Sequence, residues 1–169
     1  PLGESHDTPR FLCSACRTLT APILPDRCHR CSAPVGPHLD TTGGCIHCAA
    51  DRFAFQRAFS LGVYADRLRS AVLAAKQPGG DVLSAALAEL LANREAVDLA
   101  NLRIDVVVPV PHHWTERLLR RHLPPVTLAE RLARLLHVPW TPHLLAKIRR
   151  TRPQTELNHT ERRNNLRGA

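Results

Sequence analysis

Apolar residues recur at helical spacing in two neighbouring segments near the middle of the chain. In residues 67–77 they fall on one face, and Pro78-Gly79-Gly80 then breaks the pattern. From Asp81 a broader apolar stripe continues to Leu91, which is typical of a helix that packs on a core. We expect two helices here, with Asp66 and Asp81 as their N-caps.

Strand-like and helix-like segments alternate over the rest of the chain. Residues 53–65 alternate enough to form one or two short strands, and 104–110 is a β-branched run typical of a buried parallel strand. Two capping boxes, Thr-x-x-Glu and Asn-x-x-Glu, predict helices over 127–137 and 158–168. This order of elements predicts the first part of an α/β domain over residues 53–169.

Residues 12–50 differ from the rest, because they have no helical or strand periodicity and are rich in proline and glycine. All six cysteines lie in this segment as three Cys-x-x-Cys pairs: Cys13/Cys16, Cys28/Cys31 and Cys45/Cys48. A two-residue gap lets one tight turn direct both sulfurs to one point, and two such knuckles complete a tetrahedral zinc site. A segment with so few core residues needs a staple of this kind to fold. We therefore expect a small zinc ribbon over residues 1–52, with zinc in a structural role.

Two other interpretations of the cysteine pairs are weaker. Disulfides would suit a secreted protein, but no leader sequence is visible and the rest of the chain has the character of a cytosolic protein. A redox-active Cys-x-x-Cys usually follows a strand and opens a helix, whereas these three pairs lie in a proline- and glycine-rich stretch.

Six thiolates do not divide into complete four-sulfur sites. The best candidates for one complete site are the two pairs that form a self-contained ribbon: Cys28, Cys31, Cys45 and Cys48. Cys13 and Cys16 would then be left over or form half of a second site. A histidine could complete the ligands, although each of the four nearby is also typical of a solvated loop: His6, His29, His38 and His47. Alternatively, a further pair preceded Pro1, since the chain has no methionine and we expect it to be a segment of a longer protein.

Composition and charge narrow the classes of function. Apolar residues make up 44% of the chain and charged residues 22%, which excludes a disordered or collagen-like protein. No apolar run is long enough to cross a membrane. The 23 basic residues exceed the 15 acidic ones by 8, and all but two of the basic residues are arginine. Arginine binds phosphate in a bidentate way, although a GC-rich coding sequence would give the same bias.

The excess of positive charge is concentrated near the C-terminus. Seven cations and two acidic residues lie between 147 and 167, which gives a net charge of +5. Such a segment is typical of a surface that binds nucleic acid or a phosphorylated small molecule, and at least as often of a solvated helix face. Because aromatic residues are only 4% of the chain, we expect phosphate contacts rather than base stacking to dominate any nucleic-acid binding. The candidate arginines are Arg149, Arg150, Arg152, Arg162, Arg163 and Arg167.

The sequence contains no nucleophile–base pair, no carboxylate dyad and no glycine-rich phosphate loop. Three other features follow one another along nearly the whole chain: the cysteine pairs, the strand-like Val106-Val-Val-Pro-Val-Pro111, and the pattern Arg150-Thr151…Gln154…Leu157…Glu161-Arg162…Asn165…Gly168-Ala169. Together they resemble the ComF family, whose members join a double zinc ribbon to a phosphoribosyltransferase-like α/β domain. The resemblance implies a bacterial, cytoplasmic protein of this kind, truncated at both ends. It also implies a role in DNA uptake during natural transformation, with single-stranded DNA and proteins of the competence machinery as partners.

The resemblance implies an alternative function as well, the transfer of phosphoribosyl groups. In phosphoribosyltransferase-like folds the loop after the first core strand meets the pyrophosphate, and here that loop would be Pro111–Arg121. Helix solvation explains the arginines of this loop about as well. The residues implied are Arg117, Arg120 and Arg121 for the pyrophosphate, Arg162 for a phosphate, and Gln154 and Asn165 for a ribose or base.

Two departures from the family pattern count against catalysis by this chain alone. After the Val-Pro-Val-Pro strand the family usually has Arg-Gly-Phe-Asn-Gln or similar, whereas this chain has Arg120-Arg-His-Leu-Pro-Pro125. The family's phosphoribosyl-pyrophosphate loop, two acidic residues followed by Thr-Thr-Gly, would lie beyond Ala169. The Thr-Thr-Gly at residues 41–43 lies between cysteine knuckles instead. We therefore expect magnesium and phosphoribosyl pyrophosphate as ligands only of the full-length protein.

Overall fold

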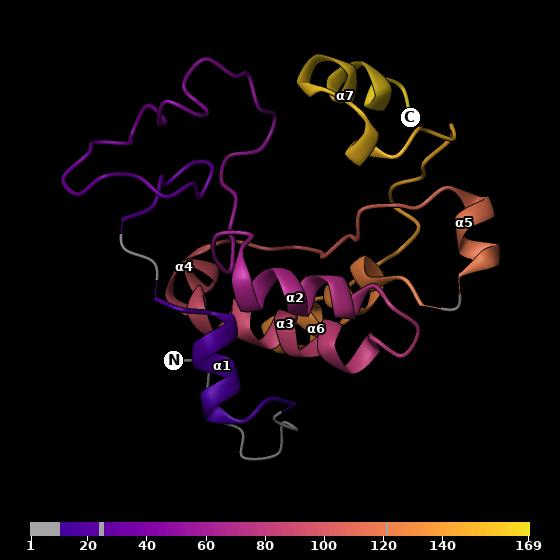
Figure 1. Cartoon of the computed structure of the whole chain (residues 1–169), viewed down its shortest axis with the longest axis horizontal. Helices are drawn as coiled ribbons and strands as arrows, with labels where there is room; N and C mark the ends of the chain where they lie inside the picture. The colour runs from indigo at the N-terminus through magenta and orange to yellow at the C-terminus, as the bar shows by residue number, and fades with distance from the viewer. Residues whose placement is uncertain (1–10, 24–25, 121) are drawn as a thin grey trace.

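The computed structural model describes residues 11–23, 26–120 and 122–169, and within these ranges the regular structure is helical (Figure 1). A long irregular segment between the first two helices carries four of the cysteines. The helices, in chain order, are α1 Ser14–Thr20, α2 Asp66–Ala75, α3 Asp81–Arg94, α4 Ala96–Asn101, α5 Trp114–Leu119, α6 Pro124–Leu136, the 3-10 helix η1 Gln154–Glu156, and α7 His159–Leu166.

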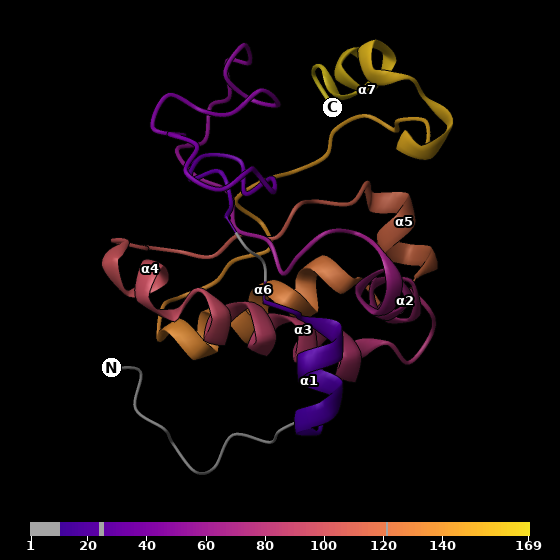
Figure 2. The same cartoon turned by 60° about the vertical axis from the view of Figure 1, so that its left-hand side comes forward.

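Helix α3 is the centre of the helical part of the molecule. Every residue from Ser84 to Leu90 is buried, because α6 packs along one side of α3 and α2 along another (Figures 1 and 2). Leu87 and Leu90 form a core cluster with Leu68 and Ala75 of α2. The buried alanines of α3 around these leucines leave room for the neighbouring helices to approach closely: Ala85, Ala86 and Ala88.

Helices α2 and α3 confirm the two helices expected from the apolar pattern, but their caps differ from the expectation. Asp66 and Asp81 are the first residues inside the helices. The N-cap positions belong to Ala65 and Gly80, and neither makes a side-chain capping hydrogen bond. Gly80 packs against the end of α2, where a Cβ would lie 2.3 Å from the carbonyl oxygen of Ala75. The two aspartates still interact favourably with the helix dipole from the first turn.

Helix α6 begins earlier than its expected capping box. It starts at Pro124 with Leu123 as the N-cap, so Thr127 and Glu130 lie inside the helix and do not cap it. Proline is favoured in a first helical turn because its φ is already helical and its missing N–H would have no partner there. The other capping box, ahead of α7, is formed as expected.

The expected strands are not present among the described residues, where β pairing is limited to isolated bridges. Residues 53–65 form no bridge, and the β-branched run at 104–110 pairs in parallel with Trp140 only through Val107. Two paired segments are marginal as a sheet, since a stable sheet needs a third strand or a packed helix. The α/β phosphoribosyltransferase-like domain expected for this part of the chain is therefore not observed.

The cysteine-bearing segment and α7 lie on the same side of the helical part (Figures 1 and 2). We name residues 26–52 the knuckle segment. Its end is joined to α7 by an ion pair, in which the Arg163 guanidinium lies 2.7 Å from the Asp51 carboxylate. This contact brings part of the cationic C-terminal segment beside the cysteines.

Candidate metal centre and its surroundings

The first knuckle is a tight hairpin around Cys28 and Cys31. Its two sides are joined by an antiparallel bridge between Arg27 and Pro34. Ser32 has a left-handed backbone, with φ of 62°, and closes the turn by donating its N–H to the Cys28 carbonyl at 2.9 Å. The turn brings both sulfurs of the pair into one cluster with those of the second knuckle.

The second knuckle turns at Cys45 and depends on a glycine. The Cys48 N–H donates to the Cys45 carbonyl at 2.9 Å, and the Cys45 N–H donates to the Cys48 sulfur at 3.3 Å. Gly44 has φ of 99°, a conformation that favours glycine. A Cβ at this position would lie 3.0 Å from the Cys48 sulfur and 3.2 Å from the Ala49 Cα. The turn of the second knuckle therefore favours glycine at position 44, directly before Cys45.

The four sulfurs of the two knuckles form one cluster and lie within 4.8 Å of one another. The Cys28 and Cys48 sulfurs are 3.7 Å apart, and those of Cys31 and Cys45 are 3.6 Å apart. The Cys45 and Cys48 sulfurs are 3.9 Å apart. A disulfide requires about 2.05 Å, whereas sulfurs bound tetrahedrally to zinc at about 2.3 Å are about 3.8 Å from each other. The observed spacing fits a tetrahedral ion, so the cluster could hold a metal such as zinc.

The pKa values of two thiols in the cluster are shifted in opposite directions. Burial raises the pKa of the Cys28 thiol, but the N–H groups of Cys31 and Arg30 outweigh burial and bring the pKa to about 6. At Cys31, burial and the neighbouring thiols raise the pKa to about 12. The thiols of this cluster thus influence one another, and a bound cation would favour their thiolate forms.

The third pair, Cys13 and Cys16, does not join this cluster. It lies at the start of α1, where the Cys13 sulfur accepts the Cys16 N–H at 3.5 Å, and both side chains are exposed. The expectation that residues 12–50 contain no helix is therefore wrong. In the part of the chain that the structure describes, no second group of metal-binding side chains comes together. His6 lies outside that part, so the half site at Cys13 and Cys16 stays a prediction.

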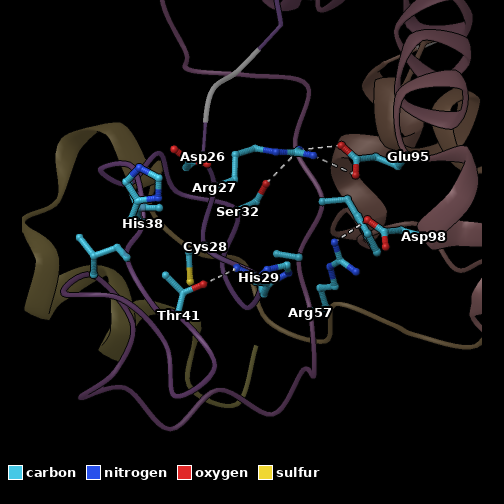
Figure 3. Close-up of a pocket in the computed structure, with 14 residues that line it drawn as sticks. Asp26, Arg27, Cys28, His29, Ser32, His38, Thr41, Arg57, Glu95 and Asp98 are labelled. Carbon is cyan, nitrogen blue, oxygen red and sulfur yellow. Dashed lines mark hydrogen bonds and ion pairs between the residues drawn. The ribbon is translucent and has the colours of Figure 1, made fainter.

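Two ion pairs join the knuckle segment and the residues directly after it to the helical part, across a cavity of about 470 Å³ (Figure 3). Arg27 donates to both carboxylate oxygens of Glu95, at 2.6 and 3.2 Å. Arg57 donates to the Asp98 carboxylate at 2.5 Å, and this hydrogen bond lowers the pKa of Asp98. The sequence gives no signal for either pair, because their members are 68 and 41 residues apart.

Three of the C-terminal arginines expected to bind anions make contacts within the chain. Arg149 donates to two carbonyl oxygens at the end of α7, and Arg162 donates to two carbonyl oxygens in the turn before α7. Arg163 pairs with Asp51. The others are exposed: Arg150, Arg152 and Arg167.

The two residues expected to contact a ribose or base have different surroundings. The Asn165 amide accepts the Arg152 N–H at 3.2 Å and donates to the Arg152 carbonyl at 2.9 Å, so this side chain fixes the backbone. The buried Gln154 amide nitrogen has no hydrogen-bond partner among the described residues. The structure does not bring the two side chains to one common ligand position.

A second cavity, of about 460 Å³, opens beside the loop that follows the β-branched run. Arg117 and Arg120 line it together with Lys147, whereas Arg121 lies outside the described residues. His112 also lines this cavity, and burial lowers its pKa. Two of the three arginines expected at a phosphate site are thus at one cavity with a further cation.

An aromatic pair that no sequence motif marks lies beside the knuckles. The rings of Phe53 and Phe55 are stacked, with centroids 4.7 Å apart and an angle of 15° between their planes. The Arg30 guanidinium lies 5.6 Å from the Phe53 ring centroid. The Phe-x-Phe spacing is visible in the sequence, where it forms part of the strand-like run at residues 53–65.

No family model matches this sequence, and comparisons with curated proteins and with solved structures find no match either. Among the described helices, none has the length and apolar character to span a bilayer. The function is therefore inferred from the geometry of the sites and the residues themselves.

Proposed function

We propose that this chain is a zinc-binding protein that binds single-stranded nucleic acid through the surface shared by the knuckle segment and α7. The observation that carries the zinc part is the tetrahedral spacing of the four sulfurs. Four protein sulfurs fill the coordination sphere of zinc, so no position is left for a substrate or a reactive water. The ion would stabilise the fold of a segment that has few core residues of its own.

Exposed cations around α7 support the nucleic-acid part of the proposal. Arg150, Arg152 and Arg167 flank or follow α7, and the Arg163–Asp51 pair attaches this helix to the knuckle segment. Guanidinium groups bind phosphate through two parallel hydrogen bonds. A positively charged segment with exposed guanidinium groups suits the flexible backbone of a single strand.

The resemblance to the ComF family supports a role for this binding in DNA uptake, with competence proteins as partners. A cytoplasmic location is part of the same proposal. Reducing conditions keep thiolates available for zinc, whereas an oxidising compartment would convert neighbouring cysteines to disulfides.

Titration of labelled oligothymidylate with the zinc-loaded chain at several salt concentrations tests the proposal. Binding through phosphates should weaken as salt rises, with a log–log slope of about −0.7 for each phosphate neutralised. Binding that does not depend on salt, or no binding at low salt, would overturn the proposal.

A second candidate function is the binding of a phosphorylated small molecule in the cavity near α5. The observation that favours it is the convergence of Arg117, Arg120 and Lys147 on this cavity. Phosphoribosyl transfer would belong to the full-length protein, since the chain has no phosphoribosyl-pyrophosphate loop of the family type. Calorimetry with phosphoribosyl pyrophosphate and magnesium tests this candidate, and no heat at millimolar ligand would remove it.

A further inference from the structure

The exposed Phe53–Phe55 pair is a feature that neither zinc binding nor phosphate contacts explain. The two side chains are 37% and 44% exposed, although stacked phenylalanine rings usually contribute to a core. They account for two of the seven aromatic residues in the chain. Phe53 stacks on Phe55 and has the Arg30 guanidinium over its ring, so the more exposed Phe55 ring offers the free aromatic face to solvent.

Arg30 links this pair to the four-sulfur cluster. This arginine lies within the first knuckle, between two of the cysteines, and its guanidinium lies near the Phe53 ring. The same guanidinium donates to the Cys48 carbonyl of the second knuckle at 3.4 Å, and the Arg30 carbonyl accepts the Ala58 N–H at 2.9 Å. Residues on both sides of the aromatic pair are thus tied to the four-sulfur cluster.

Positive charge borders the aromatic pair. Asp51, close before Phe53 in the chain, holds Arg163 of α7, and Arg52 between them is exposed. A base can stack on an aromatic ring while its phosphate binds a neighbouring guanidinium, and this combination is typical of single-strand-binding surfaces. An apolar protein partner would have to cover the exposed Arg52 guanidinium without pairing it, which is costly.

We propose that Phe53 and Phe55 form a base-stacking platform for single-stranded nucleic acid, an inference that rests on the proposed function. Stacking on one aromatic side chain changes affinity by about 5- to 150-fold per base. The low aromatic content of the chain had suggested that stacking contributes little, but the structure places two rings together at the surface. We expect a base-dependent contribution to affinity in addition to the salt-dependent one.

The test compares two ligands of equal length and charge, oligothymidylate and an abasic oligodeoxynucleotide, each titrated with the zinc-loaded whole chain. The unmodified chain should bind oligothymidylate about 5- to 150-fold more tightly than the abasic strand. Phe55→Ala should remove most of this preference and leave the affinity for the abasic strand and its salt dependence unchanged, because Phe55 does not contact Arg30 through a cation–π interaction. Phe55→Trp should retain the preference, because a larger aromatic face still stacks.

A matched control is Tyr64→Ala, which removes an aromatic side chain that is 54% exposed just before α2. It should change neither affinity, and the zinc content of every variant should equal that of the unmodified chain. Equal affinity of the unmodified chain for the two strands would overturn the platform while the proposed function stands. A preference that survives Phe53→Ala and Phe55→Ala together would also overturn it. No binding of either strand at low salt would overturn the proposed function and the platform with it.

Discussion

Arg27, the residue directly before the first cysteine of the sulfur cluster, forms a bidentate ion pair with Glu95. The two N–O distances are 2.6 and 3.2 Å. Glu95 is the residue at which α3 ends and α4 begins, and its side chain is 1% exposed, against 24% for Arg27. A buried carboxylate of the helical part is thus neutralised by the knuckle that carries two of the sulfurs (Figure 3).

Arg27→Ala is expected to destabilise the protein by about 3–5 kcal/mol, because it leaves the buried Glu95 carboxylate without its partner. Urea unfolding of the zinc-loaded protein measures this loss. The double variant Arg27→Ala, Glu95→Gln should recover part of the stability, since the uncompensated charge is then gone. Arg134→Ala is the matched control, because it breaks an exposed pair with Glu130 on α6, worth only about 0.3–0.5 kcal/mol. Equal losses for Arg27→Ala and Arg134→Ala would contradict this account.

The metal content of the protein is expected to depend on four cysteines and not on six. Purified under reducing conditions, the chain should bind about one zinc, and replacing any cluster cysteine by serine should abolish tight binding. The double variant Cys13→Ser, Cys16→Ser should keep its zinc, because this exposed pair lies apart from the cluster. Metal analysis with cobalt substitution, which reports tetrahedral sulfur ligation, provides the measurement. Protein that contains oxidised cysteines and no metal would show that the cluster is not a zinc site.

The features that could be predicted from the sequence are those determined by residues close together in the chain. The four cysteines that come together are those of the two pairs that form one self-contained ribbon, whereas Cys13 and Cys16 have the same spacing and lie apart. Each pair of the cluster is shaped by one turn. The capping box at Asn158 and Glu161 is formed by groups three residues apart, and the apolar stripe of α3 reflects its own burial. In each case the residues that decide the structure are neighbours in the sequence.

The parts that were missed depend on distant partners. A β-branched run becomes a strand only when another segment pairs with it along its length, and the 104–110 run meets Trp140 at a single bridge. The Arg27–Glu95 pair joins residues 68 positions apart. The cationic C-terminal segment looked uniform, yet Arg149 and Arg162 satisfy backbone carbonyls. Only the fold separates such structural arginines from those available to a ligand.

Arginines that bind backbone carbonyls and arginines that are exposed should respond differently to substitution by alanine. Arg149→Ala and Arg162→Ala each remove hydrogen bonds that hold the α7 segment, at a cost of about 1 kcal/mol per bond. Arg150→Ala and Arg152→Ala should change stability by less than about 0.5 kcal/mol, since both side chains are exposed. Each of these two variants should instead reduce the salt-dependence slope of oligothymidylate binding by about 0.7.

The control for charge alone is Arg69→Ala, which removes an exposed cation from α2. Its slope should match that of the unmodified chain. If Arg69→Ala lowers the slope as much as Arg150→Ala does, binding follows net charge and not a defined surface. Unfolding curves for all the variants show which loss of affinity comes from a loss of fold.

His112 is expected to titrate below the ordinary histidine range. Burial lowers its pKa, Glu116 opposes this, and Arg120 and Lys147 lower the pKa further. The folded protein therefore takes up a proton less readily than the unfolded chain. The contribution of neutral His112 to the free energy of unfolding is fully present above the unfolded pKa of about 6.5. It is lost as pH falls through the pKa of His112 in the folded protein. NMR titration of the imidazole measures the pKa directly. Between pH 7.5 and the folded pKa of His112, the free energy of unfolding should fall less in His112→Gln than in the unmodified chain. An imidazole midpoint above the ordinary histidine pKa would contradict the prediction.

Two adjacent glycines provide a controlled test of how the second knuckle is built. Gly44→Ala places a Cβ 3.0 Å from the Cys48 sulfur and forces an L-residue to φ of 99°, so it should weaken the metal site and cost at least about 1–2 kcal/mol from the backbone alone. At Gly43 a Cβ would meet nothing within 4 Å, so Gly43→Ala should change stability by less than about 1 kcal/mol. Competition with a chromophoric chelator measures zinc affinity in both variants. Because the two substitutions add the same methyl group to neighbouring positions, a difference confined to Gly44→Ala can come only from the turn that directs the Cys48 sulfur. Equal zinc affinity in the two variants would show that this turn does not determine the site.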